Sequence, residues 1–323
     1  MLIPVFLFAV GLVLLIKGGD WFVDGATGIA RRFRLPELLI GATVVSIGTT
    51  LPEVMVSTTS ALSGHSQIAY GNAVGSVICN TALIAALTIA VRPTRVDTRT
   101  LRTPVAFFFA AAAFYAVVAY TTGEFTRMAG VLLLVFFVVY MVLTVHEMTG
   151  GPQTAPQPGE KIQKETSLWR LILLLAVGAA LIAVGADLLV DNGTLIAQAL
   201  GVPESVIALT LVALGTSLPE LTTAITALAK GHSALSLGNI IGANLFNLVL
   251  VSGTAMTLCP FEIPENSTLF GINSSLVVDL PVMLLVMLIL TVPTLKRGRL
   301  TRTQGVTLLA IYAAFCVYQF TMG

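Results

Sequence analysis

Long apolar stretches separated by short polar segments dominate the chain. Ten of these stretches approach or exceed the roughly 20 residues that a helix needs to cross the hydrocarbon core of a bilayer. They are expected at residues 2–30, 37–62, 67–91, 103–121, 126–147, 168–199, 204–229, 234–258, 274–293 and 303–321. The pattern therefore predicts an all-α integral membrane protein with ten transmembrane helices.

The composition agrees with this pattern. Hydrophobic residues make up 56% of the 323 residues and charged residues only 10%, and the mean hydropathy is +0.94. A soluble fold could not bury that much apolar surface, and little chain remains outside the ten stretches. We therefore expect no enzyme activity. The first stretch lacks a basic leading region and a small-residue cleavage pattern, so it is expected to be a helix rather than a signal peptide.

Basic residues gather in alternate loops. They are Arg31, Arg32 and Arg34; Arg92, Arg95, Arg99 and Arg102; Lys161, Lys164 and Arg170; Lys230; and Lys296, Arg297, Arg299 and Arg302. The opposite loops hold only Arg127. Because basic loops tend to stay in the cytoplasm, both termini are expected outside the cytoplasm, in the cell (inner) membrane. Topology accounts for these charges, so the lipid bilayer is the expected partner, with no nucleic acid and no obligate protein partner.

The chain repeats itself at an offset of 167 residues. The hexapeptide Gly48-Thr49-Thr50-Leu51-Pro52-Glu53 recurs as Gly215-Thr216-Ser217-Leu218-Pro219-Glu220. Residues 41–80 and 208–247 share 15 identities in 40 ungapped positions. Each copy holds five predicted helices, and an odd number makes the second copy enter the membrane from the opposite side. The expected organisation is a first repeat at 1–148 (helices 1–5), a cytoplasmic linker at 149–167 and a second repeat at 168–323 (helices 6–10).

Each hexapeptide places a carboxylate inside an apolar segment, which is costly and marks a functional site by default. Pro52 lacks the N–H that the carbonyl of Gly48 would accept, so we expect a kink that frees carbonyl oxygens around Ser46 to Gly48. Thr49 and Glu53 lie four residues apart and share a helix face. The same arrangement is expected in the second copy, with Ala213 to Gly215, Thr216, Ser217, Pro219 and Glu220.

Helices 3 and 8 are expected to add further polar groups. Ser76 and Asn80 share a helix face, and their counterparts are Ala243 and Asn247. Faces of small residues, expected to allow close backbone approach, are formed by Gly71 and Gly75 and by Gly238 and Gly242. The combined donor set is nearly all oxygen, with two negative charges and no imidazole or thiol. Such a set suits hard cations: Ca²⁺ takes 6–8 oxygen ligands, and Na⁺ would use the same atoms.

Two aspartate pairs, Asp20/Asp24 and Asp187/Asp191, have four-residue spacing near the ends of long helices. Each pair forms either a solvated or ion-paired face or a guide for cations. Lys17 is a candidate to neutralise Asp20.

The doubled G-T-[ST]-L-P-E motif, followed by G-N-x-x-G, resembles the sodium/calcium exchanger family of the cation/calcium antiporter superfamily over essentially the whole chain. The resemblance, to prokaryotic-type members, implies an antiporter that exchanges Na⁺ for Ca²⁺ by alternating access and normally extrudes Ca²⁺, with no organic cofactor. It also implies a set of ion ligands. These are Glu53, Glu220, Thr49, Thr50, Thr216, Ser217, Ser76, Asn80, Asn247 and the carbonyls of Ser46 and Ala213.

Two departures from the family pattern bear on coupling. Ala243 stands where a serine would match Ser76, so one outer Na⁺ site is expected to be altered or lost. Asn247 is uncharged where some relatives, including potassium-dependent ones, carry an acid, which weakens the case for K⁺ coupling. A proton/Ca²⁺ antiporter on the same scaffold is the main alternative. An intramembrane hydrolase would need a nucleophile–base set that is missing, and channels more often use rings of subunits than one two-fold chain.

Overall fold

A computed structural model of the protein describes residues 2–64, 66–150, 166–200, 215–263, 268–269 and 271–322. Within these residues, nine helices are long and apolar enough to cross a membrane. They correspond to nine of the ten predicted stretches. The start of the remaining stretch, 204–229, lies outside the described residues, and its end forms α11 (Leu218–Ala229). The all-α membrane architecture predicted from the hydropathy pattern is confirmed.

The chain divides into two compact units. Unit 1 comprises Met1–Thr49 and His146–Asn239, and unit 2 comprises Thr50–Val145 and Ile240–Gly323. The chain passes from one unit to the other within α3 (Ser46–Leu62), α7 (Arg127–Gly150) and α12 (Ser233–Phe246). Each unit therefore contains segments from both sequence repeats. The repeat boundaries at residues 148 and 168 stay a prediction.

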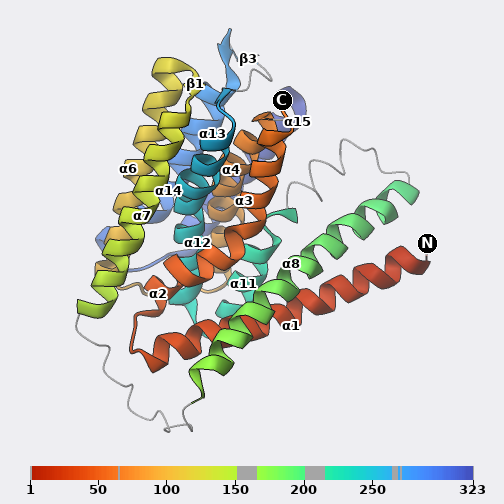
Figure 1. The fold of residues 1–323 in the computed structure, drawn as a ribbon, viewed down its shortest axis with the longest axis vertical. Helices are drawn as coiled ribbons and strands as arrows, with labels where there is room; N and C mark the ends of the chain where they lie inside the picture. Colours follow the sequence, from red (N-terminus) through yellow and green to blue (C-terminus); the bar gives the residue numbers. More distant parts are fainter. Residues whose placement is uncertain are drawn as a thin grey trace. The chain divides into compact units, whose positions relative to one another are not determined.

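Unit 1 is built around two long helices, α1 (Leu2–Arg32) and α8 (Leu168–Ala199), which run side by side (Figure 1). The unit also contains α2 (Glu37–Ile40), the π-helix η1 (Gly41–Val45), α11 and the start of α12. A buried apolar cluster that includes Phe22, Val23 and Ile182 lies in this unit. The two long helices thus share one core.

Glycines form the seam between α1 and α8. A Cβ built on Gly11 would lie 2.9 Å from the carbonyl oxygen of Gly185, and one built on Gly18 would lie 2.9 Å from that of Gly178. At the repeat offset of 167, Gly11 corresponds to Gly178 and Gly18 to Gly185. The two contacts therefore exchange with one another when the repeats are exchanged. The packing of α1 against α8 therefore follows the two-fold relation between the repeats.

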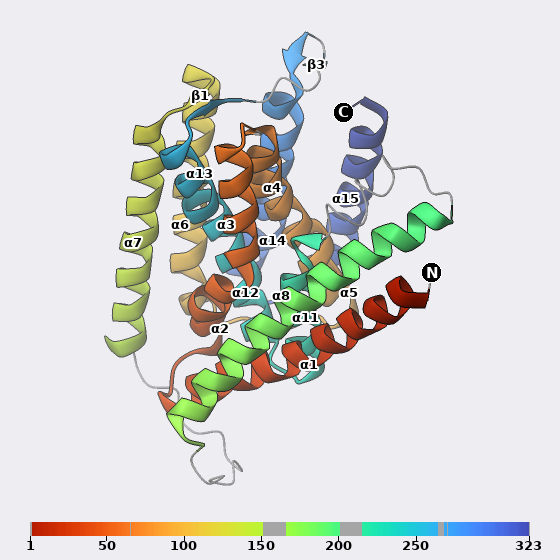
Figure 2. The ribbon, with the colours of Figure 1, turned by 45° about the vertical axis from the view of Figure 1, so that its right-hand side comes forward.

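Unit 2 holds the remaining spans. Besides most of α3 and α7 and the end of α12, its helical elements are α4 (Ser66–Cys79), η2 (Asn80–Ala85), α5 (Ala86–Val91), α6 (Thr98–Thr122), η4 (Asn247–Val251), α13 (Ser252–Leu258), η5 (Ser275–Asp279), α14 (Leu280–Arg297) and α15 (Arg302–Met322). Helices α6 and α7 lie side by side (Figure 2) and touch through aromatic rings, such as those of Phe107 and Tyr140 at 5.4 Å. The carboxylate of Asp97 caps α6 by accepting from the backbone N–H of Arg99 at 2.9 Å.

Short strands join loops of unit 2. Strand β1 (Glu124–Phe125) pairs antiparallel with β2 (Phe261–Glu262), and β3 (Thr268–Leu269) pairs with β4 (Ile272–Asn273). The rings of Phe125 and Phe261 lie 5.4 Å apart across the first pair. These strands were not predicted, because two residues are too few to leave a hydropathy signal.

The glycine that follows α3 has the same backbone conformation as the glycine that follows α11. Gly64 has φ of 82° and Gly231 has φ of 85°. This left-handed region is open to glycine and strained for most other residues. The matching glycines of the two repeats therefore adopt the same left-handed conformation in equivalent turns.

Candidate ion-binding site

The first hexapeptide lies within α3, which continues through Pro52. Glu53 is fully buried, at 0% exposure. Asn72 of α4 steadies this part of α3: its Nδ2 donates to the backbone oxygen of Glu53 at 3.2 Å and to Oγ of Ser57 at 2.8 Å. The turn that carries the carboxylate is thus fixed by the neighbouring helix.

A π turn lies one turn before the predicted kink, and the kink itself stays a prediction. The wide π turn η1 ends at Val45, whereas the kink was expected around Ser46 to Gly48. The hydroxyl of Ser46 donates to the carbonyl of Gly41 at 2.7 Å, five residues back. Ser252 repeats this bond to Asn247 at 3.0 Å, after η4. The backbone N–H of each serine donates to the same carbonyl, so the hydroxyl adds a second donor to the carbonyl that opens the π turn, a feature that was not predicted.

The second hexapeptide begins a new helix. α11 starts at Leu218 with Pro219 in its first turn, where the missing N–H leaves no hydrogen bond unmade. Thr216 and Ser217 form a turn before it. The described part of the second copy is therefore interrupted at Thr216 and Ser217, next to the glycine and proline where a kink was expected. Glu220 is fully buried in the first turn of α11, where the helix dipole favours a negative charge.

Asn239 links polar residues of unit 1. Its Oδ1 accepts from the hydroxyl of Thr49 at 3.2 Å, and its backbone oxygen accepts from Ser46 at 3.0 Å. Both hydroxyls are buried. The backbone oxygen of Ser46, 3.5 Å away, is a second acceptor for the Thr49 hydroxyl. Because this hydroxyl acts as a donor in both contacts, the lone pairs of its oxygen remain available to a cation. At the repeat offset of 167, Asn239 corresponds to Asn72, and neither asparagine was among the predicted ligands.

The repeat-related asparagines Asn80 and Asn247 are each the first residue of a π-helix, η2 and η4. Both are fully buried. Within the described residues, their side-chain amides have no hydrogen-bond partner, and the same holds for the hydroxyls of Thr50 and Ser217. A buried polar group without a partner costs about 1–3 kcal/mol, and contact with a cation would offset this cost for the oxygens. The π turns, which are frequent at functional sites, were not predicted.

The remaining predicted ligands have different surroundings. Ser76 is buried in α4, one turn before Asn80, and Thr216 is half-buried. Ala213 lies outside the described residues, so its carbonyl stays a prediction. Within the described residues, no three side chains among His, Cys, Asp and Glu gather as a metal site. The candidate donors there are carboxylate, hydroxyl, amide and carbonyl oxygens, the ligands of hard cations.

The glycine faces differ between the repeats. Gly238 packs onto the carbonyl of Leu38, and a Cβ on Gly41 would lie 2.8 Å from the backbone nitrogen of Asn239. This close crossing brings Asn239 to Ser46 and Thr49. The expectation was wrong for Gly71 and Gly75, because a Cβ on either would meet no described atom within 4 Å.

Asn244 is a buried polar residue of unit 2 that sequence reasoning missed. Its Nδ2 donates to Oγ1 of Thr81 at 2.7 Å and lies 3.3 Å from Sδ of Met287. It thereby ties α12 to η2 and α14, three residues before Asn247. Its repeat counterpart is the apolar Val77, so the comparison of the two copies gave no signal.

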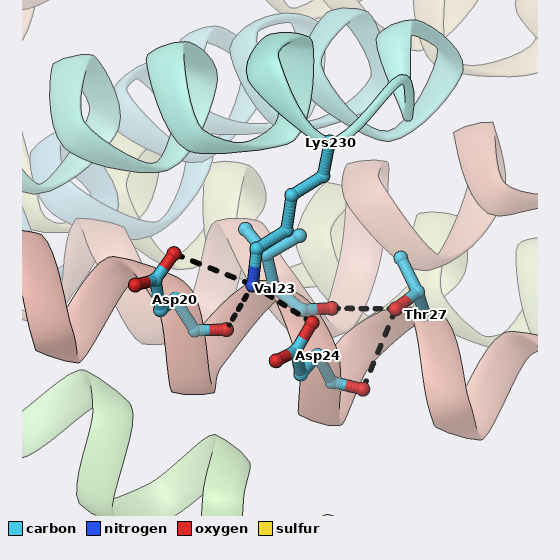
Figure 3. A network of polar contacts seen from close by, with 5 residues as sticks. All are labelled: Asp20, Val23, Asp24, Thr27 and Lys230. Atoms are coloured by element: carbon cyan, nitrogen blue, oxygen red, sulfur yellow. Dashed lines mark hydrogen bonds and ion pairs between the residues drawn. The ribbon is translucent and has the colours of Figure 1, made fainter.

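The first aspartate pair is ion-paired with Lys230, the residue that follows α11 (Figure 3). Nζ of Lys230 lies 2.8 Å from Oδ1 of Asp24 and 3.4 Å from Oδ1 of Asp20, and donates to the backbone oxygen of Asp20 at 2.9 Å. The ion-paired interpretation is confirmed for this pair, with Lys230 rather than Lys17 as the partner. The repeat counterpart of Lys230 is Ser63, so the lysine belongs to one repeat only.

Comparisons with known proteins extend over both repeats. A family model described as sodium/calcium exchanger protein matches residues 3–146 and 170–321. The chain belongs to the sodium/calcium exchanger family. The chain is 30% identical over 345 residues to the sodium/calcium exchanger MaX1 of Methanosarcina acetivorans, with 96% of each chain covered. It is 35% identical over 268 residues to the inner membrane protein YrbG of Escherichia coli, covering 81% of this chain and 82% of that one.

Solved structures of the sodium-calcium exchanger NCX_Mj have the same fold. One, soaked with Na⁺ and Sr²⁺, aligns with a TM-score of 0.83 and 31% identity over 100% of this chain and 99% of that one. Another, soaked with Na⁺ and Ca²⁺, gives a TM-score of 0.81 at 31% identity, with 99% of each chain covered. The family resemblance and the multi-pass membrane architecture of two inverted repeats are confirmed.

Proposed function

We propose that this exchanger transports Ca²⁺ against Na⁺ by alternating access, with Glu53 and Glu220 as its Ca²⁺-binding carboxylates, and that it normally extrudes Ca²⁺. One observation carries the proposal. The repeated G-T-[ST]-L-P-E hexapeptide places one fully buried carboxylate in each repeat of a sodium/calcium exchanger family member. Two buried carboxylates match the charge of one Ca²⁺.

The other proposed ligands are neutral oxygens. They are the hydroxyls of Thr49, Thr50, Thr216, Ser217 and Ser76, the carbonyls of Ser46 and Ala213, and the amides of Asn80 and Asn247. Their number allows the 6–8 oxygen ligands that Ca²⁺ takes, with a subset serving Na⁺. The buried amides and hydroxyls without hydrogen-bond partners in the described residues support this assignment.

Charge neutralisation supplies the coupling. With Ca²⁺ or several Na⁺ bound, the carboxylates are neutralised, and passage through a closed state becomes less costly. Without cations, the charges favour water and reorientation is disfavoured, so exchange dominates over leak. Helices α1 and α8 are the proposed moving elements, because both are long and their glycine contacts match one another across the two repeats.

The membrane setting follows from the basic loops. We place the chain in the cell (inner) membrane with both termini outside the cytoplasm. H⁺ or K⁺ are the other candidate coupling ions.

Radioactive Ca²⁺ uptake into proteoliposomes tests the proposal. Vesicles loaded with Na⁺ are diluted into Na⁺-free buffer, beside K⁺-loaded and pH-gradient vesicles. We expect uptake only with internal Na⁺, and loss of it in Glu53→Gln and in Glu220→Gln. Glu262→Gln, which removes an exposed carboxylate of β2, is the matched control and should transport normally. Full uptake by both glutamine variants would refute the site, and uptake that follows the pH gradient would instead assign proton coupling.

A further inference from the structure

Eight basic residues gather at one end of unit 2. Helix α5 ends at Val91 and α6 begins at Thr98, while α14 ends at Arg297 and α15 begins at Arg302. The basic residues on the two connections and the adjoining helix ends are Arg92, Arg95, Arg99, Arg102, Lys296, Arg297, Arg299 and Arg302. Within residues 92–102 and 296–302 there is one acidic residue, Asp97, and its carboxylate caps α6. The ends of these four helices therefore form one region of concentrated positive charge.

Backbone bonds hold the two connections together. Arg95 and Arg299 form an antiparallel bridge. On either side of it, the N–H of Val96 donates to the carbonyl of Gly298 at 2.9 Å, and the N–H of Leu300 donates to the carbonyl of Thr94 at 2.8 Å. The arginines are therefore mounted on a fixed frame contributed by both repeats.

A cavity opens on this frame. It has a volume of about 550 Å³ and is lined by Arg95, Arg297, Gly298 and Arg299. No salt bridge to an acidic side chain is formed by these three arginines within the described part of the chain. Membrane topology calls for basic residues on this side but does not require them around one cavity. Gathering like charges is unfavourable, so the arrangement calls for an anionic ligand.

We propose that this cavity binds the phosphate headgroup of an anionic phospholipid in the adjoining leaflet. The cavity lies at the ends of membrane spans, which is where headgroups lie. Guanidinium groups bind phosphate through paired N–H donors, which favours arginine over a diffuse positive surface. Clusters of four to eight basic residues beside a span are typical of anionic lipid binding. Free phosphate has the same chemistry but lacks the acyl chains that hold the headgroup at this depth.

Native mass spectrometry of the full chain released from nanodiscs tests this assignment. The nanodiscs contain phosphatidylcholine with phosphatidylglycerol. The triple variant Arg95→Gln, Arg297→Gln, Arg299→Gln is compared with Arg31→Gln, Arg32→Gln, Arg34→Gln, which loses the same charge from another basic connection expected on the same side. We expect bound phosphatidylglycerol to fall at least about fivefold in the first variant and less than about twofold in the second. Equal losses would overturn the site in favour of general attraction to the leaflet.

Two further arms keep the result decisive. The triple variant with lysine at 95, 297 and 299 keeps the charge but loses the paired donors, so it should retain an intermediate amount of phosphatidylglycerol. If the glutamine variant does not fold, the lysine variant alone carries the test, and wild-type levels of bound lipid in it would overturn the arginine cavity. Inorganic phosphate added in detergent should not raise the melting temperature; stabilisation equal to that by phosphatidylglycerol would assign a soluble anion instead.

Discussion

Gly238 lies directly against the backbone carbonyl of Leu38, so a side chain at position 238 has no room. Its repeat counterpart Gly71 faces no described atom within 4 Å of a Cβ. Of these two equivalent glycines, only Gly238 is needed for a close contact between helices in the described residues.

Alanine at these two positions should give opposite results. Gly238→Ala forces the crossing helices apart, and we expect a loss of about 1–3 kcal/mol in the free energy of unfolding. Gly71→Ala should be neutral or stabilise by about 0.5–1 kcal/mol, because alanine favours the helix. Thermal unfolding in one detergent compares the two variants directly. Equal shifts would contradict the close contact at Gly238.

Asn239 should tune the response to Na⁺ through Thr49. Asn239→Ala removes the acceptor of the Thr49 hydroxyl, worth about 1 kcal/mol, or about a fivefold change in an equilibrium constant. We expect the Na⁺ concentration for half-maximal Ca²⁺ uptake to rise by about that factor. Thr49→Val should act in the same direction, and the double variant should show less than the sum. Asn192→Ala, which removes a bond to the carbonyl of Leu188, should leave the Na⁺ dependence unchanged.

Loss of Lys230 should destabilise the protein in a salt-dependent way. Lys230→Met leaves Asp20 and Asp24 facing each other without their cation. Both carboxylates are well solvated, at 39% and 56% exposure, so the expected cost is only about 0.5–1 kcal/mol. The deficit should shrink between low and high salt, because salt screens their repulsion. Lys230→Arg should behave like the parent. A deficit that ignores salt would point to lost packing instead of lost charge pairing.

Ala243→Ser should restore the hydroxyl that matches Ser76. Position 243 is fully buried in α12, so the added oxygen faces the interior. If the neutral ligands act as proposed, the Na⁺ concentration for half-maximal uptake should fall by roughly two- to fivefold, the effect of about 0.5–1 kcal/mol, and Ser76→Ala should raise it. Ala112→Ser, an equally buried alanine of α6, serves as control. No change in either Ala243→Ser or Ser76→Ala would argue against a hydroxyl-lined Na⁺ site in these helices.

The membrane spans and the repeat could be predicted because their signals are local or periodic. A span needs about 20 apolar residues in a row. The register of the repeats, which pairs Gly64 with Gly231, follows from aligning the two halves of the sequence at the offset of 167. The two buried glutamates followed from the same register. Each of these features depends on composition along the chain rather than on which distant residue lies nearby.

The missed features depend on partners far apart in the sequence. Lys230 reaches Asp24 across 206 positions, and Asn244 reaches Thr81 across 163. The π turns at Asn80 and Asn247 leave the hydropathy pattern unchanged, because one widened turn does not alter which residues are apolar. The difference between Gly71 and Gly238 likewise arises from what packs against each helix.

The glycine seam between α1 and α8 has a consequence for how the repeat could have evolved. Gly11 meets Gly185 as Gly18 meets Gly178, so the surface that each long helix offers is complementary to itself. Such an isologous contact is the kind that joins identical protomers in a two-fold dimer. Two separate five-helix chains, inserted in opposite orientations, would meet through this surface without needing a new one. Duplication and fusion of their gene would therefore preserve a pre-existing dimer interface inside a single polypeptide.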